Sequence, residues 1–190
     1  LIYLKLEDVI KAIRSFDKAI QMDKSNFAAR LNLGLITFNF RDYERSYQLL
    51  GEATALKPEH VDALLARSVA ARALKKFDEA KRGYEKVLVL KPNHPGAIFN
   101  LAVLQQDYVE IEGFEARAEN IKIVITQYEK VLNFTQDKAL RKKVAQRIED
   151  ARLILESIEA EKEMAAEEAK AKEQESATPP PADAGSAPAQ

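Results

Sequence analysis

The chain has 190 residues, of which 29 are basic and 30 acidic, and its formal net charge is -1. This balance is not the basic footprint of a nucleic-acid-binding protein, and no apolar run approaches the ~18 residues that suggest a transmembrane helix. The absence of cysteine excludes disulfides and thiol chemistry. There is also no Gly-rich phosphate loop and no His-Glu-x-x-His motif, so we expect neither an enzyme nor a bound cofactor.

The sequence repeats itself with a period of 34 residues, because residues 57–60 (Lys-Pro-Glu-His) return at 91–94 as Lys-Pro-Asn-His. Such a period is typical of stacked helical hairpins, in which small residues lie where helices cross and bulky residues fill the gaps. Small residues share this phase at Ala12, Ser46 and Ala80, and bulky residues follow four positions later at Phe16, Leu50 and Tyr84. A third set comes three positions after these, at Ala19, Ala53 and Val87.

This pattern resembles the tetratricopeptide repeat family. The resemblance implies an all-α fold, a right-handed superhelical solenoid of helix hairpins. The C-terminal residues themselves predict a long capping helix followed by a disordered tail. With Tyr3 at the eleventh repeat position, the chain is expected to start within the first helix of a repeat, as a fragment of a longer protein. The predicted units are a partial repeat at 1–26, repeats at 27–60 and 61–94, an irregular lengthened repeat at 95–136, a long amphipathic to charged helix at 137–176, and a disordered Pro/Ala-rich tail at 177–190.

The third repeat departs from the pattern, because its closing segment from Tyr128 arrives ten residues later than the period requires. The extra length, residues 105–123, is too apolar for a free loop. It is interpreted either as lengthened helices bent near Gly113 or as a surface insertion without function.

The C-terminal segment changes from an apolar stripe to a charged surface. The stripe suits packing on the last repeat. Beyond residue 158 charges and alanines favour helix without a partner, and residues 159–190 carry a net charge of -5. The stripe consists of Leu140, Val144, Ile148, Ala151, Leu155 and Ile158.

The helix predicted at residues 28–39 carries a second apolar face in addition to the one that packs in its hairpin, and the next two repeats have equivalent positions. In the family these positions line a concave groove, and an Asn at the sixth repeat position often hydrogen-bonds a bound peptide. The resemblance therefore implies a protein-binding groove made by Leu31, Asn32, Leu35, Phe38, Leu65, Val69, Arg72, Phe99, Asn100 and Val103. Ala66 breaks the Asn series in the middle.

One branch of the family holds the C-terminal carboxylate of chaperone tails with Lys and Asn in the first repeat, Asn in the second, and Lys and Arg in the third. Here the matching positions hold Leu31 and Leu35, then Ala66, then Gly96 and Asn100. A frame shifted by one repeat also lacks the basic residues. The sequence therefore argues against a receptor for chaperone tails.

Two histidines, His60 and His94, share one repeat position. A metal site is conceivable, but no third ligand is evident, so both are interpreted as ordinary polar residues of inter-repeat turns and no metal is expected.

An exposed apolar groove usually marks a partner site, so the sequence predicts a non-catalytic scaffold or adaptor that binds an extended peptide or an amphipathic helix. The groove could instead be filled by the chain's own elements. Two further alternatives stay open, namely the targeting module of an enzyme whose catalytic domain lies upstream, and a structural subunit that self-associates through its long helix.

The Pro/Ala-rich ending is similar to the tails of high-GC bacterial envelope proteins, and the irregular third repeat followed by residues 141–152 resembles bacterial repeat lipoproteins linked to gliding motility. That similarity implies a lipid anchor upstream and a place in the bacterial cell envelope, with a cytoplasmic location as the alternative.

Overall fold

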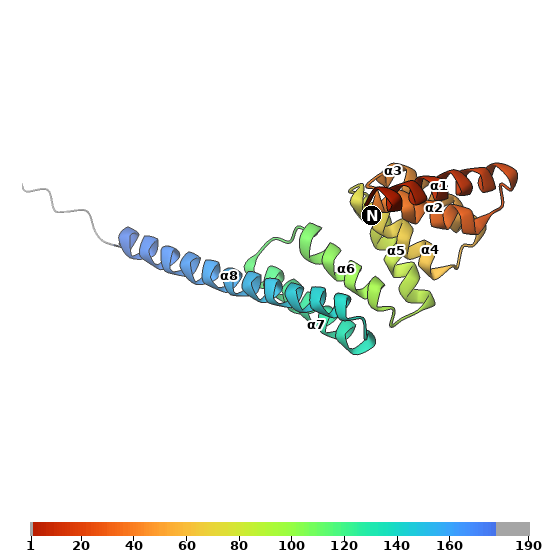
Figure 1. Ribbon diagram of the computed structural model, residues 1–190. Coiled ribbons are helices and arrows are strands. Elements are labelled where there is room, and N and C mark those ends of the chain that lie inside the picture. The colour runs from red at the N-terminus through yellow and green to blue at the C-terminus, as the bar shows by residue number, and fades with distance from the viewer. Residues whose placement is uncertain (1, 178–190) are drawn as a thin grey trace, which may run out of the picture.

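The computed structural model describes residues 2–177, and side chains are described for residues 7–174. Within this part of the chain all regular structure is helical, as the sequence predicted, and no helix is long and apolar enough to cross a membrane. Successive helices form antiparallel neighbours that follow one another along the molecule (Figure 1). They are α1 (Ile2–Met22), α2 (Phe27–Asn39), α3 (Tyr43–Leu56), α4 (Val61–Ala73), α5 (Phe77–Leu90), α6 (Pro95–Tyr108), α7 (Phe114–Phe134) and α8 (Lys138–Ala177).

The 34-residue period is visible in the helix caps. Asn26, His60 and His94 occupy equivalent positions, and the side chain of each accepts a hydrogen bond from the backbone N–H three residues later. Such a cap satisfies a donor that the first turn of a helix would otherwise leave without a partner. At the other end of α2 and α4, Arg41 and Lys75 adopt positive φ angles of 63° and 59° and close the turn within the hairpin.

The hairpins pack as their small and bulky positions predicted. In α3 and α5 the phased positions are fully buried, whereas those of α1 are half-buried. Helices α2 and α3 approach so closely that the hydroxyl of Ser46 donates a hydrogen bond of 2.8 Å to the carbonyl of Gly34. The buried members are Ser46, Leu50 and Ala53 in α3 and Ala80, Tyr84 and Val87 in α5.

The sequence predicts that the chain starts within the first helix of a repeat, but between residues 2 and 22 the structure shows no turn to a second helix. Helix α1 runs without a break from Ile2 to Met22. Its sequence contains neither Gly nor Pro, so nothing in it favours a turn over a continuing helix.

The third hairpin is enlarged by a longer second helix and a new loop. Helix α7 has 21 residues, compared with 14 in α5, and it begins after Gly113, whose φ of 85° suits glycine. The prediction of a lengthened helix is therefore confirmed, but the chain turns at Gly113 instead of bending a helix. The added turns of α7 are not a surface insertion, because Ile121 packs in a buried cluster with Ala151 and Ile158 of α8.

Helix α8 caps the solenoid on α7, as the apolar stripe predicted. Val144, Ile148, Ala151 and Ile158 are buried. Every residue from 159 to 174 is exposed, and Figure 1 shows this part of α8 extending beyond the rest of the molecule. The tail predicted to be disordered lies outside the described residues, apart from Ala177 at the end of α8.

Candidate functional site

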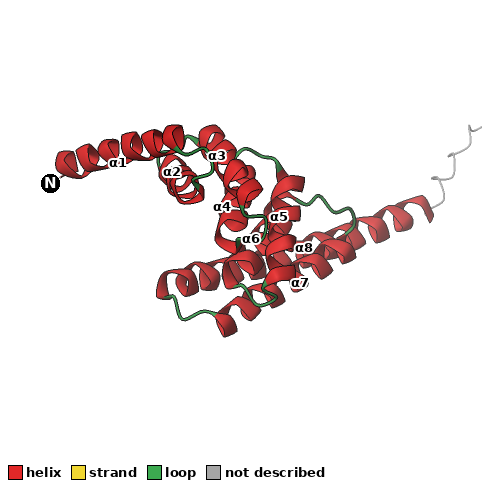
Figure 2. Cartoon of the chain, turned by 90° about the vertical axis from the view of Figure 1, so that its right-hand side faces the viewer, coloured by secondary structure: helices red, strands yellow, loops and turns green. Residues whose placement is uncertain are grey.

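An apolar groove lies between the first helices of two consecutive hairpins, α2 and α4. It encloses about 290 Å³. Figure 2 shows that α2 and α4 belong to neighbouring hairpins of the solenoid. We call this cavity the α2–α4 groove; its lining residues are Leu35, Phe38, Leu50, Asp62, Leu65, Ala66 and Val69.

The apolar side chains of the groove are held in place from below by the hairpin cores. Phe38 contacts the ring of Tyr43 at a centroid distance of 5.2 Å, while Leu65 and Val69 are half-buried against the cluster around Tyr84. Leu35 remains 42% exposed at the rim. These contacts anchor three of the apolar side chains on the hairpins, and the exposed part of Leu35 leaves apolar surface open to a ligand.

The α2–α4 groove is lined by a single carboxylate, that of Asp62. Asp62 lies in the first turn of α4 and is exposed. It forms no ion pair or side-chain hydrogen bond with any residue in the described part of the chain. The groove thus combines apolar walls with one negative charge that a bound cation could neutralise.

The predicted groove does not continue along α6. Val103 is only 2% exposed and belongs to the core cluster formed with α7 and α8, so its assignment to an open binding surface was wrong. Phe99 is half-buried against the same cluster, 5.9 Å from the ring of Tyr128. The physical reason is that the enlarged third hairpin and α8 cover positions that an ordinary repeat leaves free.

The polar residues predicted for the groove are partnered within the chain. The side-chain amides of Asn32 and Asn100 donate to the carbonyls of Ala28 and Gly96, one helical turn back, at 2.9 and 2.7 Å. Arg72 donates to the carbonyl oxygen of the Asn100 side chain at 3.5 Å. Leu31 is half-buried and does not line the groove. Of the ten predicted residues, the structure brings together Leu35, Phe38, Leu65 and Val69 in the groove.

The two histidines are structural. The Nδ1 atoms of His60 and His94 accept hydrogen bonds from the N–H groups of Ala63 and Ala97 at 3.3 and 3.2 Å. Across the described residues, no cluster of three His, Cys, Asp or Glu side chains could hold a metal ion.

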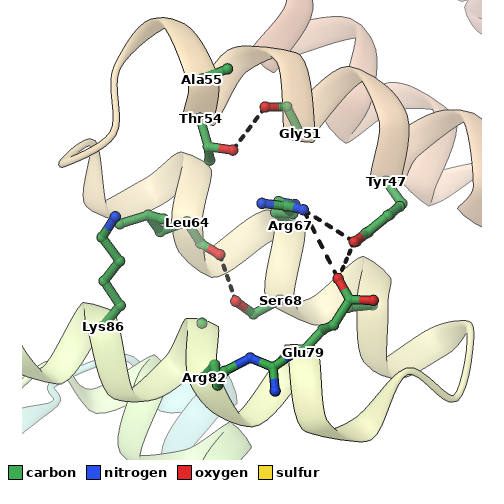
Figure 3. Close-up of a pocket in the computed structure, with 12 residues that line it drawn as sticks. Tyr47, Gly51, Thr54, Ala55, Leu64, Arg67, Ser68, Glu79, Arg82 and Lys86 are labelled. Carbon is green, nitrogen blue, oxygen red and sulfur yellow. Dashed lines mark hydrogen bonds and ion pairs between the residues drawn. The ribbon is translucent and has the colours of Figure 1, made fainter.

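A second cavity, which the sequence did not predict, lies on the other side of α4. It encloses about 410 Å³ between α3, α4 and α5 (Figure 3). Gly51 and Gly83 face it, and they fall outside the 34-residue phase, so the periodic pattern gave no reason to consider them.

Comparison with known proteins places this architecture in a family. The family model described as tetratricopeptide repeat matches residues 1–26. The solved first tetratricopeptide domain of Spaghetti (RPAP3), which holds the HSP90 peptide SRMEEVD, is 30% identical and superimposes with a TM-score of 0.51; the match covers 55% of this chain and 82% of that one. The chain is a tetratricopeptide repeat protein.

Two further relatives describe how far this likeness extends. Human RNA polymerase II-associated protein 3 is 28% identical over 128 residues, a match that covers 67% of this repeat protein but only 19% of the human one. The crystal structure of MamA, 20% identical, matches 83% of this chain and 94% of its own with a TM-score of 0.55. At that identity MamA supports the fold alone.

Proposed function

We propose that this tetratricopeptide repeat protein is a non-catalytic adaptor that binds a peptide or amphipathic helix of a protein partner in the α2–α4 groove. The observation that carries this proposal is the open apolar surface between α2 and α4, which no other described element covers. Open apolar surface in a cleft is costly to expose to water and is typical of partner sites. The RPAP3 domain, which is 30% identical and holds a peptide, supports a role of this kind.

The chemistry of the groove favours apolar and basic ligands. Its walls supply Leu35, Phe38, Leu65 and Val69, while Asp62 supplies a carboxylate. A ligand helix that fits would present apolar side chains three or four residues apart and a Lys or Arg near Asp62.

An acidic tail such as the HSP90 peptide does not fit this groove. The family's carboxylate clamp needs basic residues at the second and sixth positions of its third repeat. If residues 61–94 take that place, those positions hold Asp62 and Ala66, and the basic residues are also missing in the frames that start at residues 27 and 61. Asp62 would repel a ligand carboxylate instead of pairing with it. The likeness to RPAP3 therefore supports peptide binding but not the same peptide.

A peptide-display selection on the full chain tests this proposal. We expect enriched peptides to combine spaced apolar residues with a Lys or Arg. Their binding should be lost in Leu35→Glu/Ala66→Glu, since the variant places two carboxylates on the apolar walls. Val89→Glu is the control for a carboxylate added outside the groove, because Val89 is 81% exposed on α5 and does not line the groove, so this variant should bind as the unmodified protein does.

Equal binding to both variants, with unchanged melting temperatures, would overturn the groove assignment. Acidic tails, or the peptide SRMEEVD, that bind the unmodified protein but not Leu35→Glu/Ala66→Glu would overturn the proposed ligand chemistry of the groove. The envelope location and the gliding-motility context stay predictions of the sequence.

A further inference from the structure

The second cavity described above lies where α4 is flanked by α3 and α5, the second helices of two consecutive hairpins. We call it the α3–α5 cleft. Figure 3 shows Arg67, Arg82 and Lys86 around it, on two helices that face each other. It encloses about 410 Å³ and is lined by Tyr47, Gly51, Thr54, Ala55, Leu64, Arg67, Ser68, Ala71, Glu79, Arg82, Gly83 and Lys86.

Two glycines shape this cleft. A Cβ atom on Gly83 would lie 1.9 Å from the hydroxyl oxygen of Ser68, so only glycine lets α5 approach α4 this closely. On the opposite wall, a Cβ atom on Gly51 would meet only the Nε atom of Arg67, at 3.7 Å. Helix α5 therefore packs tightly against α4 at Gly83, whereas the cleft is open beside Gly51.

The cleft has one carboxylate, which is already engaged. Glu79 accepts a hydrogen bond from the hydroxyl of Tyr47, and its carboxylate lies 4.0 Å from Arg67. The hydrogen bond from Tyr47, with smaller contributions from nearby cations, lowers the pKa of Glu79. This carboxyl group stays ionised near neutral pH and is directed at its partners in the wall of the cleft.

The positively charged side chains of the cleft still have hydrogen-bond donors without a partner. The Nε–H group of Arg67 is buried and has no hydrogen-bond partner, although its terminal nitrogen donates to Tyr47 at 3.1 Å. Arg82 and Lys86 form no side-chain hydrogen bond or ion pair with another residue in the described part of the chain. Three cations thus face one carboxylate. A buried N–H group without a partner is unfavourable, and the Arg67 side chain is still 40% exposed, so its accessible part can donate to a ligand oxygen.

The cleft and the α2–α4 groove use different faces of the same helix. Leu64, Arg67 and Ser68 of α4 face the cleft, whereas Leu65 and Val69 face the groove. At 3.6 residues per turn these two sets point in roughly opposite directions. The two cavities can therefore be occupied at the same time. The α3–α5 cleft is positively charged, whereas the α2–α4 groove is apolar and carries a single negative charge.

We propose that the α3–α5 cleft is a second binding site, which takes a carboxylate-rich segment of a protein partner. The ligand carboxylates would accept hydrogen bonds from Arg67 and pair with Arg82 and Lys86. This site does not depend on the proposed function of the groove, because no residue lines both cavities.

Fluorescence anisotropy with labelled hexaglutamate as the probe, titrated with the full chain, tests this proposal. Hexaglutamate should bind, and its affinity should fall with rising salt. Arg82→Gln/Lys86→Gln should weaken binding about tenfold, as expected for the loss of two charged contacts. Glu79→Gln keeps a hydrogen-bond acceptor for Tyr47 but removes the competing charge, so it should tighten binding.

The matched control is Lys75→Gln/Lys81→Gln, which makes the same change in net charge at exposed positions outside the cleft. It should leave the affinity nearly unchanged. Absence of binding, or an equal loss in both double variants, would overturn the proposal, since the second result would mean unspecific attraction. Displacement of hexaglutamate by an equal concentration of inorganic phosphate would also overturn it, because the cleft would then recognise a free oxyanion. The apolar peptides selected on the groove should bind all these variants alike, so failure at one cavity is distinguishable from failure at the other.

Discussion

The close crossing of α2 and α3 predicts opposite effects for the same substitution at two helical glycines. In Gly34→Ala the new Cβ would lie 2.7 and 2.9 Å from two carbons of Leu50, which is fully buried. Carbon atoms in contact prefer about 3.5–4.0 Å, so the helices must move apart. Overpacking of this kind costs about 1–3 kcal/mol, while replacing a helical Gly by Ala stabilises by about 1 kcal/mol. The expected balance is a loss of about 1 kcal/mol.

Gly51→Ala is the control, because its new Cβ would meet only Arg67 Nε, at an ordinary 3.7 Å. It should gain about 1 kcal/mol from helix propensity, which places the two variants about 2 kcal/mol apart. Urea unfolding followed by far-UV circular dichroism measures this difference. In a Leu50→Ala background the clash disappears, so Gly34→Ala should no longer destabilise the protein. If Gly34→Ala is as stable as Gly51→Ala, or if its cost persists in the Leu50→Ala background, the reasoning from close packing is refuted.

Two buried polar groups give further predictions. Burial raises the pKa of Tyr128 well above its ordinary value of 10.0, so its contribution to stability is complete below pH 10 and is lost as the pH rises further. Tyr128→Phe should reduce the alkaline loss seen in urea unfolding at successive pH values, and should cost about 1 kcal/mol at neutral pH because the hydrogen bond to Gln106 is lost; an unchanged alkaline slope would contradict this. The Arg30 side chain is only 9% exposed and donates from Nε to Glu52 at 2.7 Å. Glu52→Ala should therefore cost about 1 kcal/mol in thermal or urea unfolding, and a neutral effect would show that water replaces the carboxylate.

The sequence was sufficient for the hairpins because their determinants are local and periodic. Helix caps, turn prolines and alternating small and bulky residues act within one repeat or between neighbours. The α2 and α4 parts of the groove followed from the same phase. Leu35 and Val69 have the environment that their repeat positions implied.

The burial of Val103 could not be predicted from the repeat pattern. Val103 is equivalent to Val69 in the 34-residue phase, but its burial is decided by α7 and α8, which do not follow that phase. The asparagines show a different limit, because composition reveals an amide at position 32 or 100 but not whether it donates to a ligand or to its own helix. The α3–α5 cleft was missed because Gly51 and Gly83 have no equivalents one repeat away.

Helix α8 continues well beyond its last contacts with α7. Its side-chain contacts with α7 finish where Arg117 pairs with Glu161 and Glu115 pairs with Lys162. The helix then continues to Ala177, and at a rise of 1.5 Å per residue this stretch is about 22 Å long. A helix of this composition behaves as a semi-rigid spacer. The exposed end of α8 therefore extends about 22 Å beyond its last ion pairs with α7, as a semi-rigid arm at one end of the solenoid.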